Sequence, residues 1–399
     1  MTTEQKKLIA PDALIEAAAK NNIEAAKSLL LQGVNLNERD GRGNTALVEA
    51  AAQGNTEMAR LLLDNKADIN MKGIIGSALI TAATYGHTET VQLLLDRNAE
   101  VDKKGDAGYT ALMSAALNGY TDIVRLLLDK GAHVDETSTI GSTALNLAAQ
   151  EGRTETVKLL LERKADVNIE SNAGTTALYS AAFYSHPEIV RLLLDNKADV
   201  DHKDKQGNTV LISAASKGRT EIVELLLDYD ADIDAVNNAG NTALNLASTD
   251  GYTETVRLLL DREADAGIKN NKGETALINA SFYNHVDVVS LILTKDIILD
   301  DCDNSGNTAL IRAASRGNND IVRLLLDKGA APDIRNNDGE TAIDAATIRY
   351  IKETAKIIQA AIDDLLAKEK EVHRSMVDEK LQRLKKIAPK LKLKAGPAL

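Results

Sequence analysis

The sequence predicts an all-α solenoid, in which pairs of short helices stack side by side in one continuous array. The first observation behind this prediction is a triplet, Thr-Ala-Leu or a close variant, that recurs at offsets of 33 residues eight times and 32 once. The second is that each period holds two apolar helical segments, whose surface only the next period can bury. The triplets begin at Thr45, Ser77, Thr110, Thr143, Thr176, Thr209, Thr242, Thr275, Thr308 and Thr341.

The fourth unit shows how one period is built. The glycine-containing segment 105–108 predicts a turn, and Thr110 is placed to cap a helix over 111–118. Gly119 then ends that helix in a left-handed conformation. A second helix over 121–130 carries a broad stripe of Ile, Val and Leu. This stripe is too wide for one partner helix to cover, so the unit needs neighbours.

The two ends of the array depart from the period, as end caps must. A degenerate copy at 12–14 brings the count to eleven units over about residues 10–365. We expect an amino-terminal capping repeat at 1–39, nine repeats at 40–335, a carboxy-terminal capping repeat at 336–366 and a helical basic tail at 367–399. Apolar residues spaced by four and three predict one helix that closes the core: Ile351, Ala355, Ile358, Ile362 and Leu365. The apolar pattern weakens beyond Glu369 and ends at Pro389.

With these motifs in place, the sequence resembles the ankyrin repeat family. The family pattern G-x-T-P-L-H-x-A-A-x-x-G-H-x-E-I-V-x-L-L-L-x-x-G-A-D-V-N is matched closely from Gly207 to Asp234, and the likeness covers about nine tenths of the chain. The resemblance implies a β-hairpin finger at each turn and a concave face built from fingers and inner helices. It also implies a non-enzymatic adaptor that binds a partner protein on that face.

Two family positions are altered. The proline of the motif is Ala or Val in every full unit, and the histidine after it is replaced, so the usual Thr–His hydrogen bond is absent. The glycine after the second helix is replaced in seven units, by Lys66, Asn98, Lys164, Lys197, Asp230, Glu263 and Asp296. Each replacement costs roughly 1–2 kcal/mol if φ stays positive. We therefore expect a softer array than an idealised one; a single sharp melt above about 90 °C would contradict this.

The amino-acid composition limits the classes of function and partner that we expect. Only 3% of the residues are aromatic, with no Trp, which argues against an enzyme core or an aromatic-lined small-molecule pocket. The net charge of −12 makes nucleic acid an unexpected partner. One cysteine, no secretory signal and no apolar run of about 18 residues suggest a soluble protein of a reducing compartment, the cytoplasm. We expect no cofactor, and a monomer.

Candidate chemical sites are better explained by the repeat. The pairs His87/Glu89, His186/Glu188 and His285/Asp287 stand where the family has a structural Gly-His-x-Glu, and a zinc site needs three or four converging ligands. The segment 301–306 resembles the start of a calcium loop, but Arg312 falls where the bidentate Glu is required. Cys302 lies between aspartates, which disfavour its thiolate. No catalytic or metal residues are assigned.

The remaining candidates are surface positions that the family uses for binding, at finger tips and at the ends of inner helices. Our partner-binding set consists of Tyr85, Tyr109, Asn118, Phe183, Tyr184, Lys217, Phe282, Tyr283 and Arg316. Exposed aromatics are enriched at binding hot spots. For each kind of aromatic residue, an alternative to partner binding stays open. The phenylalanines could instead pack on the adjoining inner helix. The tyrosines recur every 99 residues, so they could instead record the duplication of a three-repeat block, without any ligand.

The tail has a positive net charge, whereas the rest of the chain has a negative one. From Lys380 to Leu399 there are seven basic residues and no acidic one: Lys380, Arg383, Lys385, Lys386, Lys390, Lys392 and Lys394. Such a segment suits solvation or docking onto the array's own acidic back, contact with an acidic membrane, or nuclear import. The second functional hypothesis is therefore a peripheral tethering factor that this basic tail addresses to a membrane or to nucleic acid. The setting, a eukaryotic signalling pathway or delivery into a host cell by a bacterium, is left open.

Overall fold

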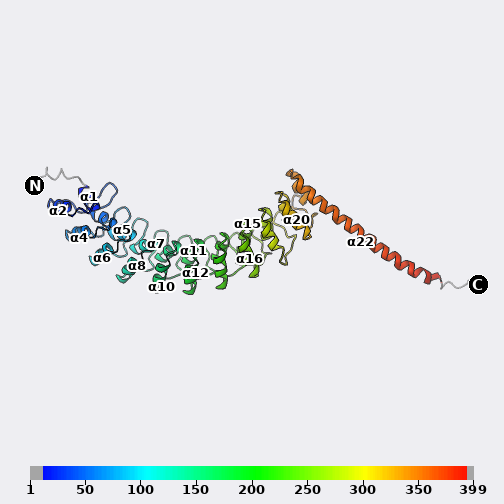
Figure 1. Cartoon of the computed structure of the whole chain (residues 1–399), viewed down its shortest axis with the longest axis horizontal. Coiled ribbons are helices and arrows are strands. Elements are labelled where there is room, and N and C mark those ends of the chain that lie inside the picture. Colours follow the sequence, from blue (N-terminus) through cyan, green and yellow to red (C-terminus); the bar gives the residue numbers. More distant parts are fainter. Residues whose placement is uncertain (1–11, 393–399) are drawn as a thin grey trace, which may run out of the picture. The chain divides into compact units, whose positions relative to one another are not determined.

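The computed structural model describes residues 12–392 of the chain, with side chains for residues 12–383. The chain divides into two compact units, Met1–Asn238 and Ala239–Leu399. Within each unit, every repeat contributes a first helix, here called inner, and a second helix, here called outer (Figure 1). Inner helices contact inner helices of neighbouring repeats, and outer helices contact outer ones. The predicted all-α solenoid is therefore confirmed within each unit.

The first unit contains seven helix pairs. Its inner helices are α1 (Ala13–Ala19), α3 (Ala46–Ala52), α5 (Ala78–Tyr85), α7 (Ala111–Asn118), α9 (Ala144–Gln150), α11 (Ala177–Phe183) and α13 (Val210–Ala215). Its outer helices are α2 (Ile23–Leu31), α4 (Thr56–Asp64), α6 (Thr88–Asp96), α8 (Thr121–Asp129), α10 (Thr154–Glu162), α12 (Pro187–Asp195) and α14 (Thr220–Asp228).

The second unit contains four pairs. The inner helices are α15 (Ala243–Asp250), α17 (Ala276–Phe282), α19 (Ala309–Ala314) and α21 (Ala342–Ile348). The outer helices are α16 (Thr253–Asp261), α18 (Val286–Ile292), α20 (Asn319–Asp327) and the much longer α22 (Lys352–Lys392). Among the described residues, no helix combines the length and the apolar character that crossing a bilayer requires.

The local signals of the fourth unit act as expected. The hydroxyl of Thr110 accepts a hydrogen bond from the backbone N–H of Met113 at 3.3 Å, so α7 begins at Ala111. Gly119 follows the helix with φ of 77°, in the left-handed region. The alanines of α7 are fully buried, which lets the neighbouring inner helices α5 and α9 approach closely.

Six of the seven residues that replace glycine after an outer helix take positive φ, between 61° and 69°: Lys66, Asn98, Lys164, Lys197, Asp230 and Glu263. The seventh, Asp296, is outside this set, because α18 ends early, at Ile292. Ile297 stands where the other repeats carry a small alanine, such as Ala264, which is only 8% exposed. Ile297 is partly exposed, and the chain leaves α18 by another path.

The fingers are tighter than the resemblance implies. In the finger before α13, Asp204 donates its N–H to the carbonyl of Asn208 at 3.0 Å, and Gly207 donates back to Asp204 at 2.8 Å. Among the described residues, strand pairing is limited to isolated bridges, Lys203 with Thr209 and Cys302 with Thr308. The expected β-hairpins are therefore turns, because too few residues separate the turn from the helix cap to form a ladder.

The carboxy-terminal helix corrects two expectations. Ile358 and Thr354 are fully buried against the last repeats, but Leu365 is 48% exposed, so it does not close the core. Helix α22 also continues past Pro389 to Lys392. It crosses the boundary placed between residues 366 and 367 without interruption.

Candidate partner-binding surface

The exposed ends of the inner helices and the finger turns form a surface in each unit that we call the inner face. Tyr85 ends α5, and Tyr184 and Tyr283 directly follow α11 and α17. Their exposed fractions are 50%, 51% and 53%. The exposure expected for these tyrosines is therefore observed. A ring left half in water presents apolar surface that a partner can cover.

The two phenylalanines are half-buried and each lies beneath a cation. The ammonium of Lys217 lies 5.7 Å from the centroid of Phe183, and the guanidinium carbon of Arg316 lies 4.1 Å from that of Phe282. In both pairs the cation comes from the next inner-helix end, 34 residues later. The phenylalanines thus pack against the adjoining repeat, the first alternative left open by the sequence, while the neighbouring tyrosines stay accessible.

Phe183 belongs to a stack of rings at the end of α11. Tyr179 lies parallel to it with centroids 6.3 Å apart, and Tyr184 meets its edge at 5.2 Å. The hydroxyl of Ser213 donates to the Tyr179 oxygen at 3.0 Å. Burial and the nearby negative charge of Asp204 raise the pKa of Tyr179 above its usual value, so its hydroxyl stays neutral at physiological pH.

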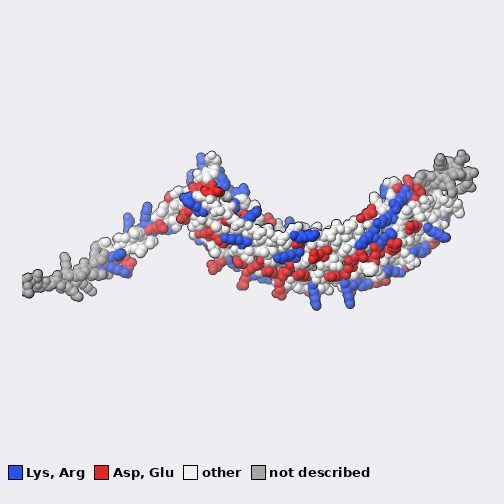
Figure 2. Space-filling view, turned by 180° about the vertical axis from the view of Figure 1, so that it is seen from behind, with Lys and Arg blue, Asp and Glu red and all other residues white. Residues whose placement is uncertain are grey.

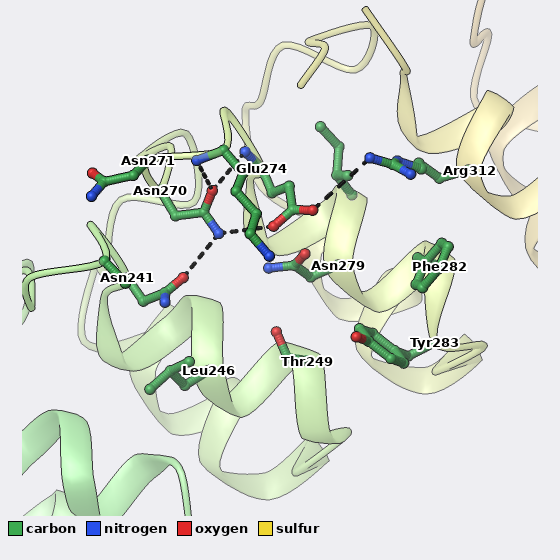
Figure 3. Close-up of a pocket in the computed structure, with 13 residues that line it drawn as sticks. Asn241, Leu246, Thr249, Asn270, Asn271, Glu274, Asn279, Phe282, Tyr283 and Arg312 are labelled. Carbon is green, nitrogen blue, oxygen red and sulfur yellow. Dashed lines mark hydrogen bonds and ion pairs between the residues drawn. The ribbon is translucent and has the colours of Figure 1, made fainter. Parts of the chain in front are cut away.

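In the second unit, a pocket of about 360 Å³ opens on the inner face between α15, α17 and a finger (Figure 3). Asn270 organises the finger side: its amide oxygen accepts from the backbone N–H of Lys272 and Glu274. Its amide N–H₂ donates to Asn241 and to Glu274, both at 3.0 Å. Figure 3 shows Thr249, Asn279, Phe282 and Tyr283 around the same hollow, which also reaches Arg312.

The first unit has two hollows on its inner face. Tyr109 and Asn118 line one of 310 Å³, together with the exposed Ile74. Tyr85 lines another of 480 Å³ beside the buried carboxylate of Glu49, which Arg42 approaches at 3.3 Å. Asn118 donates to the Ser114 carbonyl at 2.9 Å, so part of its amide is engaged. All nine residues of the predicted set thus lie on the inner face of one unit or the other.

The three histidines of the possible metal pairs form hydrogen bonds within the repeat structure. His87, His186 and His285 each put Nε2 at 3.0 Å from a backbone carbonyl, of Ala52, Gln150 and Thr249 respectively. Because a carbonyl only accepts, Nε2 carries the proton. Within the described residues, no group of three or more His, Cys, Asp or Glu could hold a metal ion.

Charged side chains lie interspersed over the outer helices (Figure 2). The last acid of one outer helix pairs with a cation that follows the next: Asp64 with Arg97, Asp96 with Lys130 and Asp129 with Arg163, each at 2.8 Å. These side chains are solvent-exposed, so each pair contributes about 0–1 kcal/mol. The outer face is a solvated, partly self-neutralised surface.

The basic tail is only partly described. Lys380 and Arg383 are exposed on α22, and Arg383 pairs with Glu379 at 3.0 Å. Lys385, Lys386, Lys390 and Lys392 lie in the same helix, but their side chains are outside the described residues, and Lys394 lies outside them entirely.

Three inner-face residues were not selected from the sequence. Tyr179, which replaces the histidine of the motif, stacks on Phe183, and the Arg312 guanidinium lies 5.5 Å from Phe282. Asn279 is 93% buried and lines the pocket of the second unit. For Asn279 and Arg312 the available signal was the fifth position of the motif, where Asn and Arg depart from the Ser, Thr and Leu found in most units.

Comparison with protein families supports this architecture. A family model described as ankyrin repeats, three copies, matches residues 4–73, 72–138, 134–204, 196–270, 262–338 and 297–364. The matches together cover residues 4–364. Comparison with curated proteins gave no match.

Proposed function

The chain belongs to the ankyrin repeat family, and from that premise we propose that it is a non-enzymatic adaptor whose inner face binds a partner protein. Ankyrin repeats generally serve as protein–protein interaction modules, and the family is typically a non-enzymatic scaffold. The proposal includes a monomer in the reducing cytoplasm, which the single cysteine favours.

One observation carries the proposal: a half-exposed tyrosine stands at the same place in three inner-helix ends, Tyr85, Tyr184 and Tyr283. Each lies beside polar side chains, and two of them rest edge-on against a phenylalanine that a cation covers. A rigid aromatic surrounded by hydrogen-bonding groups is the composition of a protein-binding hot spot.

The test replaces the three tyrosines together with alanine and compares affinity-purified partners by quantitative mass spectrometry. Loss of a partner that the wild-type chain enriches, with an unchanged circular dichroism spectrum, is the expected result. The control is Tyr229→Ala, because Tyr229 caps the outer helix α14 and its hydroxyl binds Asp195 at 2.5 Å, away from the inner-helix ends. Equal partner capture by the folded triple variant would contradict the proposal.

The second candidate, a factor tethered to an acidic membrane, is favoured by one feature: seven basic and no acidic residues between Lys380 and Leu399. Deletion of residues 380–399 separates the two. An adaptor keeps its protein partner after the deletion, whereas a tethered factor loses sedimentation with vesicles that contain phosphatidylserine.

A further inference from the structure

The pocket on the inner face of the second unit contains a buried polar side chain without a partner. Asn279 is 93% buried and lines the pocket, and no hydrogen bond joins its carboxamide to a described residue. Neighbouring polar groups in the same pocket are engaged, since Asn270 binds Asn241 and Glu274. The Asn279 amide therefore has its hydrogen-bonding groups free for water in the pocket or for a ligand that replaces the water.

The charges around the pocket are unequally paired. Arg312 donates through Nε to Asp303 at 2.8 Å and approaches Glu274 at 4.0 Å, so its charge is offset by two carboxylates. Lys272 lines the pocket and has no acid within ion-pairing distance among the described residues. Arg316 lies over Phe282 and likewise makes no ion pair there. Lys272 is therefore the cation lining this pocket that pairs with no described carboxylate, in a chain of net charge −12.

The equivalent place in the first unit carries different side chains. Ile278 of the pocket corresponds to Tyr179, 99 residues earlier, whose ring stacks on Phe183 and whose hydroxyl binds Ser213. Asn279 corresponds to Ser180. The two blocks are thus alike in their Phe-Tyr pair and differ in the side chain that stands beside the phenylalanine, a tyrosine in the first unit and the smaller Ile278 in the second.

We propose that this pocket receives the carboxylate of an aspartate or glutamate side chain on an extended segment of the partner protein. The Asn279 amide and the Lys272 ammonium donate hydrogen bonds to the carboxylate oxygens, and the exposed ring of Tyr283 covers the aliphatic part of the side chain. One oxygen of Glu274 already accepts a hydrogen bond from Asn270 at 3.0 Å, and the other lies 4.0 Å from the Arg312 guanidinium. This inference rests on the proposed function and specifies the partner chemistry at one site.

The experiment selects peptides from a phage-displayed random linear library on the full-length chain and measures their affinities by fluorescence anisotropy. We expect an acidic residue at one fixed position of the selected sequences. Its replacement by Gln or Asn should weaken binding to the wild-type chain by about tenfold or more, because charge-assisted hydrogen bonds in a partly buried site are lost. Against Lys272→Ala, the same peptide change should have a much smaller effect.

Each chain variant copies a residue that another repeat already carries at the same position. Ile278→Tyr imports the side chain of Tyr179 and should block the pocket. Lys272→Ala copies Ala173, and Asn279→Leu copies Leu246. The last two keep the test decisive if Ile278→Tyr does not fold. The control is Tyr229→Ala, on the outer helix α14 and away from the inner face, which should leave the affinity unchanged.

Selected peptides without an acidic preference, undiminished binding to Ile278→Tyr or to Asn279→Leu, or no enrichment of any peptide would each overturn the inference. Peptides that bind elsewhere on the inner face would do so while leaving the adaptor function intact. Failure of the adaptor function itself is seen separately, as unchanged partner capture by the triple tyrosine variant.

Discussion

The imidazole of His186 covers the α-carbon of Gly152 so closely that a methyl group there would lie 2.6 Å from Cε1 of the ring. The same imidazole hydrogen-bonds the carbonyl of Gln150, the last residue of α9. Each such histidine therefore joins an outer helix to the inner helix of the preceding repeat. His87 and His285 repeat the arrangement over Gly54 and Gly251.

Gly152→Ala tests this junction. Gly152 has φ of 69°, where alanine costs about 1–2 kcal/mol, and the methyl group also displaces the histidine ring. The control Gly131→Ala has only the cost of placing alanine at positive φ, because φ is 88° there and nothing lies within 4 Å of an added methyl group. We expect Gly152→Ala to lower the free energy of unfolding by about 1 kcal/mol more than Gly131→Ala, the value of one hydrogen bond, measured by urea denaturation. Equal losses would mean that the ring moves aside freely.

Ser248→Ala and Ser281→Ala are expected to stabilise the protein. Within the described residues, these two hydroxyls are buried and have no hydrogen-bond partner. Eight other repeats carry alanine at the same place: Ala18, Ala51, Ala83, Ala116, Ala149, Ala182, Ala215 and Ala314. Each substitution removes an uncompensated polar group, so we expect a gain of about 1 kcal/mol in the free energy of unfolding. The contrasting change is Ser213→Ala, whose hydroxyl binds Tyr179 and whose loss should destabilise.

Lys164→Gly should stabilise the turn that follows α10. Lys164 has φ of 62°, and glycine removes the steric cost of that conformation, about 1–2 kcal/mol, although it also gains freedom in the unfolded chain. The net gain expected in urea denaturation is about 0.5–1 kcal/mol. Asp296→Gly is the control: Asp296 is not among the positive-φ residues, so glycine brings only its entropic penalty and should destabilise. A gain at both positions would contradict the link to positive φ.

The contrast between Lys164 and Asp296 shows which features of the fold can be predicted from neighbouring residues in the sequence. Caps and turns, such as Thr110 and Gly119, depend on residues within one helix turn, so the sequence predicted them. The path at Asp296 follows the early end of α18 at Ile292, which no residue of the repeat motif signals. The pocket beside Asn279 was likewise not predicted. It depends on how side chains of neighbouring repeats pack, and the repeat pattern says nothing about the volume left between them.

His133 is expected to titrate above its ordinary pKa. Its Nδ1 lies 2.5 Å from the Asp102 carboxylate, and this hydrogen bond, followed by the charge of Asp102, raises the pKa of His133 above 6.5. The protonated form is favoured in the folded state, so the contribution of this pair to stability is fully present below pH 6.5 and is lost as the pH rises through the raised pKa. Side-chain NMR titration measures the shift directly.

Asp102→Asn is the matched variant for that titration, since it keeps the shape of the side chain and removes its charge. The pKa of His133 should fall toward its ordinary value. An unshifted His133 in the wild-type chain would contradict the prediction.

The cation above each phenylalanine should couple to it with different strength. Arg316 lies 4.1 Å from the Phe282 ring and Lys217 lies 5.7 Å from the Phe183 ring. Attraction between a cation and a ring decreases with distance, and a planar guanidinium also stacks. A double-mutant cycle with Phe282→Leu and Arg316→Gln should give a coupling energy of about 0.5–1 kcal/mol, measured from urea unfolding. The cycle with Phe183→Leu and Lys217→Gln should give less, and a larger value there would contradict the geometry. A firmly held Arg316 keeps Phe282 covered, so Tyr283 is the exposed ring of the aromatic pair at the end of α17.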